Sequence, residues 1–428
     1  MTTNMTRQHP PASLLAALAA RPRLLNIICA LLTLGWLALV STTLSTDIND
    51  ARQYWRGASD MLTLGDPYAS TPDRATIAEL QSTGRNNFEA SYYLYPPLFA
   101  YLAQPLGMLN ERQAQLVIFG LNIVGLSGLI WLCLQVSASN FAKRYWGLVA
   151  LMAMVVPFTR LSLQLGQVSI MLTLTIVGAY TLAKFPGPLA GLLNALAAMI
   201  KIYPLLLWCY YLWRGPRRTF WWSLFAAVLL LISSLVIYGS APYASFIEKV
   251  LRSAAYPYAA EHNISLVGFF SRMLTVHRYG VAPLIMPWLA QLLGAMTSLA
   301  VLGGCLWATA RASTSAAPLV FSVWLCTMLL ISPANGYYNL VALLFPLLCG
   351  LRALEIQPDR NARNLLVLAT ALSCIPPGWS SALPIYTLVH TGWGLLLLTP
   401  SLYGLCLYLG LMIWLAQRPA HSTGELTS

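Results

Sequence analysis

The chain has 428 residues, of which 58% are hydrophobic and only 9% are charged, and its mean hydropathy is +0.65. A soluble domain is about 45–50% apolar and about 25% charged, so this composition excludes a soluble globular protein and favours the lipid bilayer as the solvent. The net charge of +12 is spread over short connecting segments, so it does not indicate a nucleic-acid partner.

Hydrophobic segments follow one another along most of the chain. They are continuously apolar rather than alternating, which predicts membrane-spanning α-helices of about 20 residues each and argues against a β-barrel. We therefore expect an all-α polytopic membrane protein with about 12 transmembrane helices, which form a single domain over residues 24–420. The predicted spans are 24–44, 114–136, 146–162, 168–183, 186–200, 203–213, 219–238, 285–309, 316–332, 339–351, 364–380 and 394–416.

The segments 186–200 and 203–213 are each too short to cross a bilayer. Pro204 lies at their junction, and a proline interrupts a helix because it has no backbone N–H to donate. Irregular backbone inside a membrane is tolerated only where it is buried in protein or lines a water-filled space. We expect two half-helices that meet at a cavity.

The basic residues predict the orientation, because short loops rich in Lys and Arg stay in the cytoplasm. With both ends inside, 14 of the 25 basic residues and only three of the 13 acidic residues lie on the cytoplasmic side. Residues 1–23 and 421–428 are then cytoplasmic tails, and the first hydrophobic segment is a retained helix of a cell-membrane protein.

Two predicted extracytoplasmic segments, 45–113 and 239–284, are too long to be simple connections. Aromatic and apolar residues recur along both, which favours short helices at the membrane interface. Eight of the 13 carboxylates lie between the first two spans. Carboxylates fixed beside a membrane suggest chemistry on a substrate that the membrane delivers.

The first outer segment begins with Asp47 and Asp50. A helix is predicted from Asp50 to the turn Gly65-Asp-Pro-Tyr68, because glycine ends helices and proline prevents their continuation. The helix dipole favours an ionised Asp50 in the first turn, but a plain helix cap explains the same position, so both interpretations stay open. A second short helix is predicted from Tyr95-Pro-Pro to about Leu109.

Two polar groups are expected at a similar depth, at the outer ends of predicted spans. Gln167 follows Gly166 between two helices. Lys201 lies at the junction of the half-helices, where its ammonium group suits a lipid phosphate. The alternative is that this side chain only extends to the lipid headgroups, and the two interpretations are equally open.

The second outer segment contains Glu261-His262-Asn263, followed by Arg272. His262 and Arg272 are candidate contacts to phosphate or hydroxyl groups. Later in the chain, the turn Ser332-Pro333 leads to Tyr337-Tyr338. Carboxylates beside aromatic side chains suit a sugar, whereas a cation near lipid suits a phosphate.

The sequence has no phosphate-binding glycine loop, dinucleotide motif or metal-ligand spacing, and its eight cysteines are scattered through apolar segments. We therefore expect no cytosolic nucleotide substrate and no cofactor, and no metal site is indicated, which leaves open whether the protein needs a metal.

Seven short motifs, in order along residues 24 to 350, resemble glycosyltransferase family 87. They are Asp50-x-x-x-Tyr54-Trp55, Gly65-Asp-Pro-Tyr68, Tyr95-Pro-Pro-Leu98, Gly166-Gln167, Lys201-x-x-Pro204, Asn263-x-Ser-Leu266 with Arg272, and Ser332-Pro333 with Tyr337-Tyr338. Members of that family are GT-C fold membrane enzymes related to mannosyltransferases that use polyprenol-phosphate-mannose.

The resemblance implies an inverting transfer of a sugar from a polyprenyl phosphate to a hydroxyl of a lipid-linked or envelope glycan on the extracytoplasmic side. Mannose is the first candidate for this sugar. The expected partners are this donor, the acceptor and membrane lipids, with no obligate protein partner. The implied site has Asp50 as general base, Asp47 and His262 in reserve, and Lys201 and Arg272 as contacts to the donor phosphate. Its substrate-binding residues are Tyr54, Tyr95, Gln167, Asn263, Tyr337 and Tyr338.

One departure concerns the turn after Ser332-Pro333, where some relatives place histidines and this chain has Tyr337-Tyr338. This departure leaves open the identity of the acceptor and the role of any catalytic histidine. Two other functions are also considered. A transporter or flippase would explain the broken helix pair at Lys201, and such a protein needs a cavity that opens to both sides. An assembly scaffold explains the polar outer face poorly.

Overall fold

The computed structural model describes residues 21–44, 50–71, 92–251 and 258–418. Within these ranges the chain forms helices and a few isolated β-bridges, with no β-strand. The predicted all-α class is confirmed. Asp47 and the two predicted tails, apart from Arg21 to Arg23, lie outside the described residues.

Six helical segments of the described chain are long and apolar enough to cross a membrane. They are α2 (Pro22–Thr42), α7 (Glu111–Ser137), α14 (Arg217–Tyr238), α17 (Pro287–Arg311), the segment Thr314–Ile331 that includes α18 (Ala317–Ile331), and the segment Tyr337–Ile356 that joins η5 (Tyr337–Leu343) to α19 (Leu344–Ile356). The chain is a multi-pass membrane protein.

The span predicted at 146–162 is bent. Helices α9 (Trp146–Val155) and α10 (Pro157–Leu165) meet at 62°, the geometry of a broken span or a re-entrant loop. Val156 between them is extended, with ψ at 138°. A residue before proline is driven out of the helical region by the proline ring, which explains the break.

Shorter helices occupy the remaining predicted spans. They are α11 (Ser169–Leu182), α12 (Leu189–Ile200), α13 (Leu206–Trp213), α20 (Arg360–Ser373) and α22 (Pro400–Ala416), with η6 (Gly392–Leu397) before the last. The break between α12 and α13 falls at Lys201 and Ile202, followed by the short η1 (Tyr203–Leu205), as the half-helix prediction requires. A count of 12 crossings stays a prediction, because these helices are shorter than a bilayer span.

The core lies where α7, α11, α18, α19 and α22 pack together. Its centre is aromatic: the rings of Tyr180 and Phe321 stack with centroids 4.2 Å apart, and Phe345 contacts both edge-on. In contrast, α2, α14 and α17 bury only a small part of their surface in the molecule. Their exposed leucines and valines suit contact with lipid.

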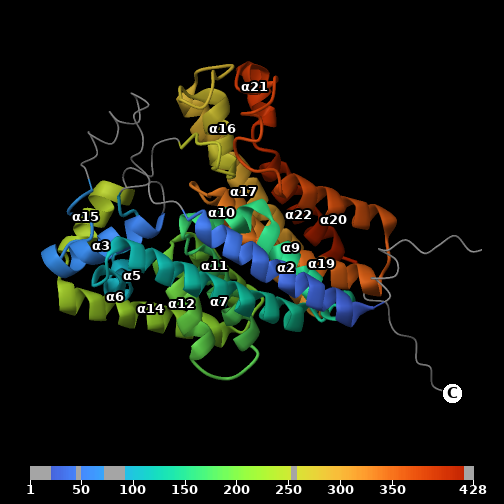
Figure 1. The fold of residues 1–428 in the computed structure, drawn as a ribbon, viewed down its shortest axis with the longest axis horizontal. Helices are drawn as coiled ribbons and strands as arrows, with labels where there is room; N and C mark the ends of the chain where they lie inside the picture. Colours follow the sequence, from blue (N-terminus) through green and yellow to red (C-terminus); the bar gives the residue numbers. More distant parts are fainter. Residues whose placement is uncertain (1–20, 45–49, 72–91, 252–257, 419–428) are drawn as a thin grey trace, which may run out of the picture.

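In the described parts of the two segments predicted to be extracytoplasmic, called the first and second outer segments here, the chain forms short helices. The first contains α3 (Asp50–Leu64), α5 (Pro97–Leu102) and α6 (Gln104–Gly107); the second contains α15 (Ala241–Ser245), the π-helix η2 (Phe246–Leu251) and α16 (Leu266–Leu274). Figure 1 shows α3, α5, α6 and α15 together at one end of the long helices, whereas α16 lies beside α21 (Tyr386–Val389) above α17. The short helix α8 (Asn140–Arg144) lies between α7 and α9 in the chain.

Candidate active site

Asp50 is the first residue of α3, and its side chain is half-buried. One carboxylate oxygen accepts a hydrogen bond from Gln53 Nε2 at 2.8 Å, and the other accepts from Gln167 Nε2. The helix then runs to Leu64 and ends at Gly65, which has a φ of 71°. Both the start and the end of this helix are as predicted.

The buried face of α3 holds Asp50 against the bundle. Ala51, Tyr54, Ala58 and Met61 are each at most 2% exposed, at the three- and four-residue spacing of one helix face. Beyond this face, the Arg52 guanidinium pairs with the Glu111 carboxylate of α7 at 2.6 Å. These contacts fix the beginning of α3, and with it the Asp50 carboxylate.

The turn at Gly166 brings α10 close to α3. Gly166 has a φ of 66°, in the left-handed region that glycine adopts without a steric penalty. A Cβ atom at this position would lie 2.7 Å from the Cβ of Ala51. Glycine is therefore required twice, by the conformation of the turn and by the approach of α3.

Gln167, the next residue, is fully buried and makes contacts with all its polar groups. Its amide nitrogen donates to Asp50, while its Oε1 accepts from the hydroxyl groups of Tyr54 at 3.3 Å and Tyr95 at 3.5 Å. Its backbone carbonyl accepts from Asn122 Nδ2 at 2.9 Å. The structure thus brings four predicted site residues, Asp50, Tyr54, Tyr95 and Gln167, into one hydrogen-bonded group.

The rings of the two tyrosines form an aromatic wall near the Asp50 carboxylate. The hydroxyl oxygens of Tyr54 and Tyr95 are 3.0 Å apart, and their rings meet edge-on with centroids 5.0 Å apart. Tyr54 is 0% exposed and Tyr95 is 8% exposed. Phe99 and Tyr93 pack against them in the same cluster.

Lys201 approaches this group from the break after α12. Its Nζ lies 5.5 Å from the ring centroid of Tyr95 and 5.2 Å from that of Tyr338, within the range of cation–π attraction. Burial lowers the pKa of Lys201 to about 8, and the negative charge of Asp50 opposes this shift. The predicted base and the predicted phosphate contact therefore lie close enough to interact.

Three buried polar residues near Lys201 were not among the predicted site residues, although the turn that carries Asn335 and Asn339 was noted for its amides. Lys201 Nζ donates to Asn339 Oδ1 at 3.4 Å, and Ser169 Oγ donates to the same oxygen at 2.6 Å. Asn339 Nδ2 in turn donates to Asn335 Oδ1 at 2.8 Å. The available signal was the placement of amides and hydroxyls at the ends of otherwise apolar segments, in the stretches 166–169 and 335–339.

Asn263 joins the second outer segment to the turn after Ser332. Its Nδ2 donates to the carbonyls of Tyr258 at 2.9 Å and Pro333 at 3.0 Å, and its Oδ1 accepts from the backbone N–H of Asn335 at 3.1 Å. Asn263 is 0% exposed. Its side chain is thus fully occupied within the protein.

His262 lies beside this junction. Its backbone carbonyl accepts from the N–H of Tyr337 at 2.8 Å, and its Nε2 is 2.6 Å from the Tyr258 hydroxyl. Burial, with repulsion from Arg272 and Arg278, lowers the pKa of His262 to about 4. The imidazole is therefore neutral at neutral pH.

Arg272 of α16 is 1% exposed and points into the protein. Its Nη1 donates to the carbonyls of Ala260 at 2.7 Å and Asn263 at 2.8 Å, and its Nη2 donates to Thr399 Oγ1 at 3.1 Å. Tyr337 is also fully buried, with its ring against Phe158. The structure does not bring either of these side chains into the group around Asp50 and Lys201.

The model of glycosyltransferase family 87 matches residues 93–333, more than half of the chain. The chain belongs to glycosyltransferase family 87. It is therefore a membrane glycosyltransferase, and the resemblance seen in the motifs is confirmed. No curated protein and no solved structure was found to match the chain.

The family match covers only part of the candidate site in this family 87 enzyme. Tyr95, Gln167 and Lys201 fall inside the matched residues, whereas Asp50 and Tyr338 fall outside them. Among the described residues, no group of three or more His, Cys, Asp or Glu side chains is arranged to hold a metal ion.

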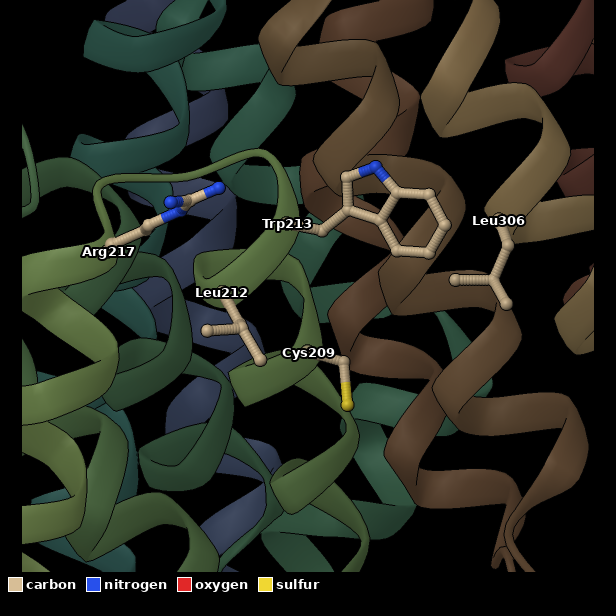
Figure 2. Close-up of a pocket in the computed structure, with 5 residues that line it drawn as sticks. All are labelled: Cys209, Leu212, Trp213, Arg217 and Leu306. Atoms are coloured by element: carbon tan, nitrogen blue, oxygen red, sulfur yellow. The ribbon is translucent and has the colours of Figure 1, made fainter.

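A hollow of about 490 Å³ lies elsewhere in this family 87 enzyme. Figure 2 shows its lining: Cys209, Leu212 and Trp213 from α13, Arg217 from α14 and Leu306 from α17. These side chains are mostly apolar, and all of them except the half-buried Leu306 are exposed. The hollow has none of the groups that surround Asp50.

Proposed function

We propose that this family 87 enzyme transfers mannose from polyprenyl-phosphate-mannose to a hydroxyl group of a lipid-linked or envelope glycan. The transfer takes place on the extracytoplasmic side, inverts the configuration at the sugar carbon C1, and uses Asp50 as general base within a GT-C-type fold. The observation that best supports the proposal is the convergence of Asp50 and Lys201, which lie 151 positions apart in the sequence, at the wall formed by Tyr54 and Tyr95.

The reaction needs a proton acceptor and a cation, and in this proposal Asp50 and Lys201 supply them. The acceptor oxygen attacks C1 as the bond from C1 to the phosphate oxygen breaks, and polyprenyl phosphate leaves with the bonding electrons. The acceptor proton passes to the Asp50 carboxylate. The Lys201 ammonium group balances the charge that accumulates on the leaving phosphate.

Solvent exposure separates the residues that would touch the substrate from the residues that support these substrate-contacting side chains. Asp50, Lys201 and Tyr338 are half-buried, so each presents a surface to a bound molecule. Gln167, Tyr54 and Asn263 are fully buried. We assign the first three to substrate contact and the buried residues to the support of the site.

Arg272 receives a supporting part in this proposal rather than the phosphate contact expected from the motif. Its guanidinium group donates three hydrogen bonds to groups of the protein itself. Lys201 then supplies the cationic contact to the donor phosphate, while Arg272 holds the second outer segment in place. His262, neutral and next to Tyr258, stays the reserve proton acceptor.

The test is a transfer assay with the purified full-length enzyme in lipid nanodiscs. Polyprenyl-phosphate-mannose labelled in the sugar is offered with a panel of glycan acceptors, and GDP-mannose is offered in a parallel reaction. We expect label on an acceptor hydroxyl, an equal amount of free polyprenyl phosphate, and an anomeric configuration in the product opposite to that of the donor.

Three other outcomes would count against the proposal. Transfer from GDP-mannose would contradict the lipid donor, and retention of configuration would contradict the single displacement. In proteoliposomes, movement of labelled donor across the membrane with the sugar still attached would support the transporter alternative instead.

A further inference from the structure

The carboxamide of Asn339 lies next to the Lys201 ammonium group. Asn339 Oδ1 accepts hydrogen bonds from Lys201 Nζ at 3.4 Å and from Ser169 Oγ at 2.6 Å. Asn339 is 3% exposed and Ser169 is 1% exposed, so neither presents a surface to a substrate. A lysine side chain is long and flexible, and a fixed acceptor restricts where its ammonium group can lie.

The orientation of the Asn339 carboxamide is itself determined by the protein. Asn339 Nδ2 donates to Asn335 Oδ1 at 2.8 Å, and Asn335 Nδ2 donates to the carbonyl of Leu329 at 2.8 Å. Because the Asn339 nitrogen is committed as a donor on this side, its oxygen must face Lys201 and Ser169. Asn335 is 0% exposed, so the chain of amides lies inside the protein.

The residues around the start of α11 contact both the group that holds Asp50 and the group that holds Lys201. Gln167 donates to Asp50, and Ser169, two residues later, donates to the carboxamide that holds Lys201. One short stretch of backbone therefore sets the position of the carboxylate and of the ammonium group together. A change in this stretch alters the separation between the two.

We propose that Asn339 and Ser169 are positioning residues that hold the Lys201 ammonium group toward the donor phosphate. The inference depends on the proposed function, which supplies the phosphate. Asn339 and Ser169 act through Lys201 and touch neither the sugar nor the acceptor.

Two substitutions of Asn339 give opposite effects on Lys201. Asn339→Leu removes the acceptor of a charged group and lowers kcat/KM for the donor about 10-fold. Asn339→Asp keeps the shape and adds a negative charge, which favours the ammonium form to higher pH and moves the alkaline limb of the pH–rate profile upward. Ser169→Ala gives a smaller loss than Asn339→Leu.

The matched control is another buried Asn–Ser pair. Asn194 Nδ2 donates to Ser223 Oγ at 3.0 Å, and the two residues are 1% and 0% exposed. Asn194→Leu removes a similar hydrogen bond away from Lys201. It lowers stability without moving the alkaline limb, which separates a positioning effect from a general loss of folding.

A second measurement on the full-length enzyme in nanodiscs needs no sugar transfer. The rate at which acetic anhydride modifies Lys201 is followed against pH by mass spectrometry, without substrate. We expect the titration of Lys201 to move to lower pH in Asn339→Leu and to higher pH in Asn339→Asp. Identical titration in wild type and both variants overturns the inference, as does wild-type kcat/KM in Asn339→Leu.

The two measurements also separate this inference from the proposed function. If Lys201 titrates as expected but the wild-type enzyme transfers no sugar from polyprenyl-phosphate-mannose, the hold of Asn339 on Lys201 is supported and the proposed donor is wrong. If transfer occurs but the titration and kcat/KM do not respond to Asn339, the donor is supported and the positioning is wrong.

Discussion

The side-chain amide of Gln167 donates a hydrogen bond to the Asp50 carboxylate across 117 residues of sequence. The same glutamine accepts from the hydroxyl groups of Tyr54 and Tyr95. Its amide therefore joins the start of α3, the segment before α5 and the turn between α10 and α11. Gln167 is thus buried at the centre of the candidate site.

Gln167→Glu places a second carboxylate against Asp50. Two adjacent carboxylates resist simultaneous ionisation, so one of them takes up a proton. Asp50 is then no longer fully ionised and works less well as a base. We expect kcat to fall by at least about 10-fold at neutral pH. Gln164→Glu, three positions earlier on α10 and bonded to Thr43 at 3.0 Å, is the control, and an equal loss there would contradict the specific role of Gln167.

Gly166→Ala tests the close approach of α3 to this turn. A non-glycine residue in the left-handed region costs about 1–2 kcal/mol, and the added Cβ also meets Ala51 at 2.7 Å. We expect a lower thermal unfolding midpoint together with reduced transfer.

Gly65→Ala is the matched control for Gly166→Ala. Gly65 has a φ of 71°, but a Cβ there meets no atom within 4 Å. It therefore carries the backbone cost alone. If both alanine variants unfold at the same midpoint and transfer equally well, the contact between Gly166 and α3 is not important.

Lys201 makes the transfer sensitive to alkaline pH. Its pKa of about 8 lies below that of a lysine in water, so the ammonium form that binds phosphate is present below pH 8 and is lost as the pH rises through that value. We expect kcat/KM for the donor to fall above about pH 8. In Lys201→Arg the guanidinium stays charged, so the alkaline fall should disappear even where the absolute rate is lower.

Arg272→Met tests the supporting part of this arginine. The change leaves the carbonyls of Ala260 and Asn263 without their guanidinium donor inside the protein. Hydrogen bonds to a charged group contribute about 1.5–3 kcal/mol, so we expect a clearly lower unfolding midpoint. The donor KM of the folded fraction should stay near the wild-type value, whereas a large rise with unchanged stability would return Arg272 to the phosphate.

Local signals in the sequence predicted much of the architecture. The helix from Asp50 to the Gly65 turn and the break at Lys201 were predicted correctly, because caps, glycines and prolines act on the backbone next to them. The bend before Pro157 has the same kind of cause, but the apolar pattern runs through it and hid it. Hydropathy alone therefore reports apolar segments better than their direction.

Side-chain partners were predicted less well. The motif around Arg272 indicated a cation on the outer face, but nothing in the neighbouring residues shows that its guanidinium group turns toward the carbonyl of Ala260 and the hydroxyl of Thr399. The roles of Asn339 and Ser169 at Lys201 were not predicted for a related reason, since their partners are 138 and 170 residues away in the sequence. Such contacts arise only when distant helices pack together.

The base is tested most directly by the transfer rate of Asp50→Asn beside that of Asp60→Asn. Both carboxylates lie on α3, but Asp60 accepts from the backbone N–H of Ser70 at 3.3 Å and lies at the far end of the helix from Gln167. Loss of a general base lowers kcat by about 10²- to 10⁴-fold, so Asp50→Asn should lose that much at an unchanged unfolding midpoint while Asp60→Asn stays near wild type. Wild-type transfer by Asp50→Asn would contradict the account.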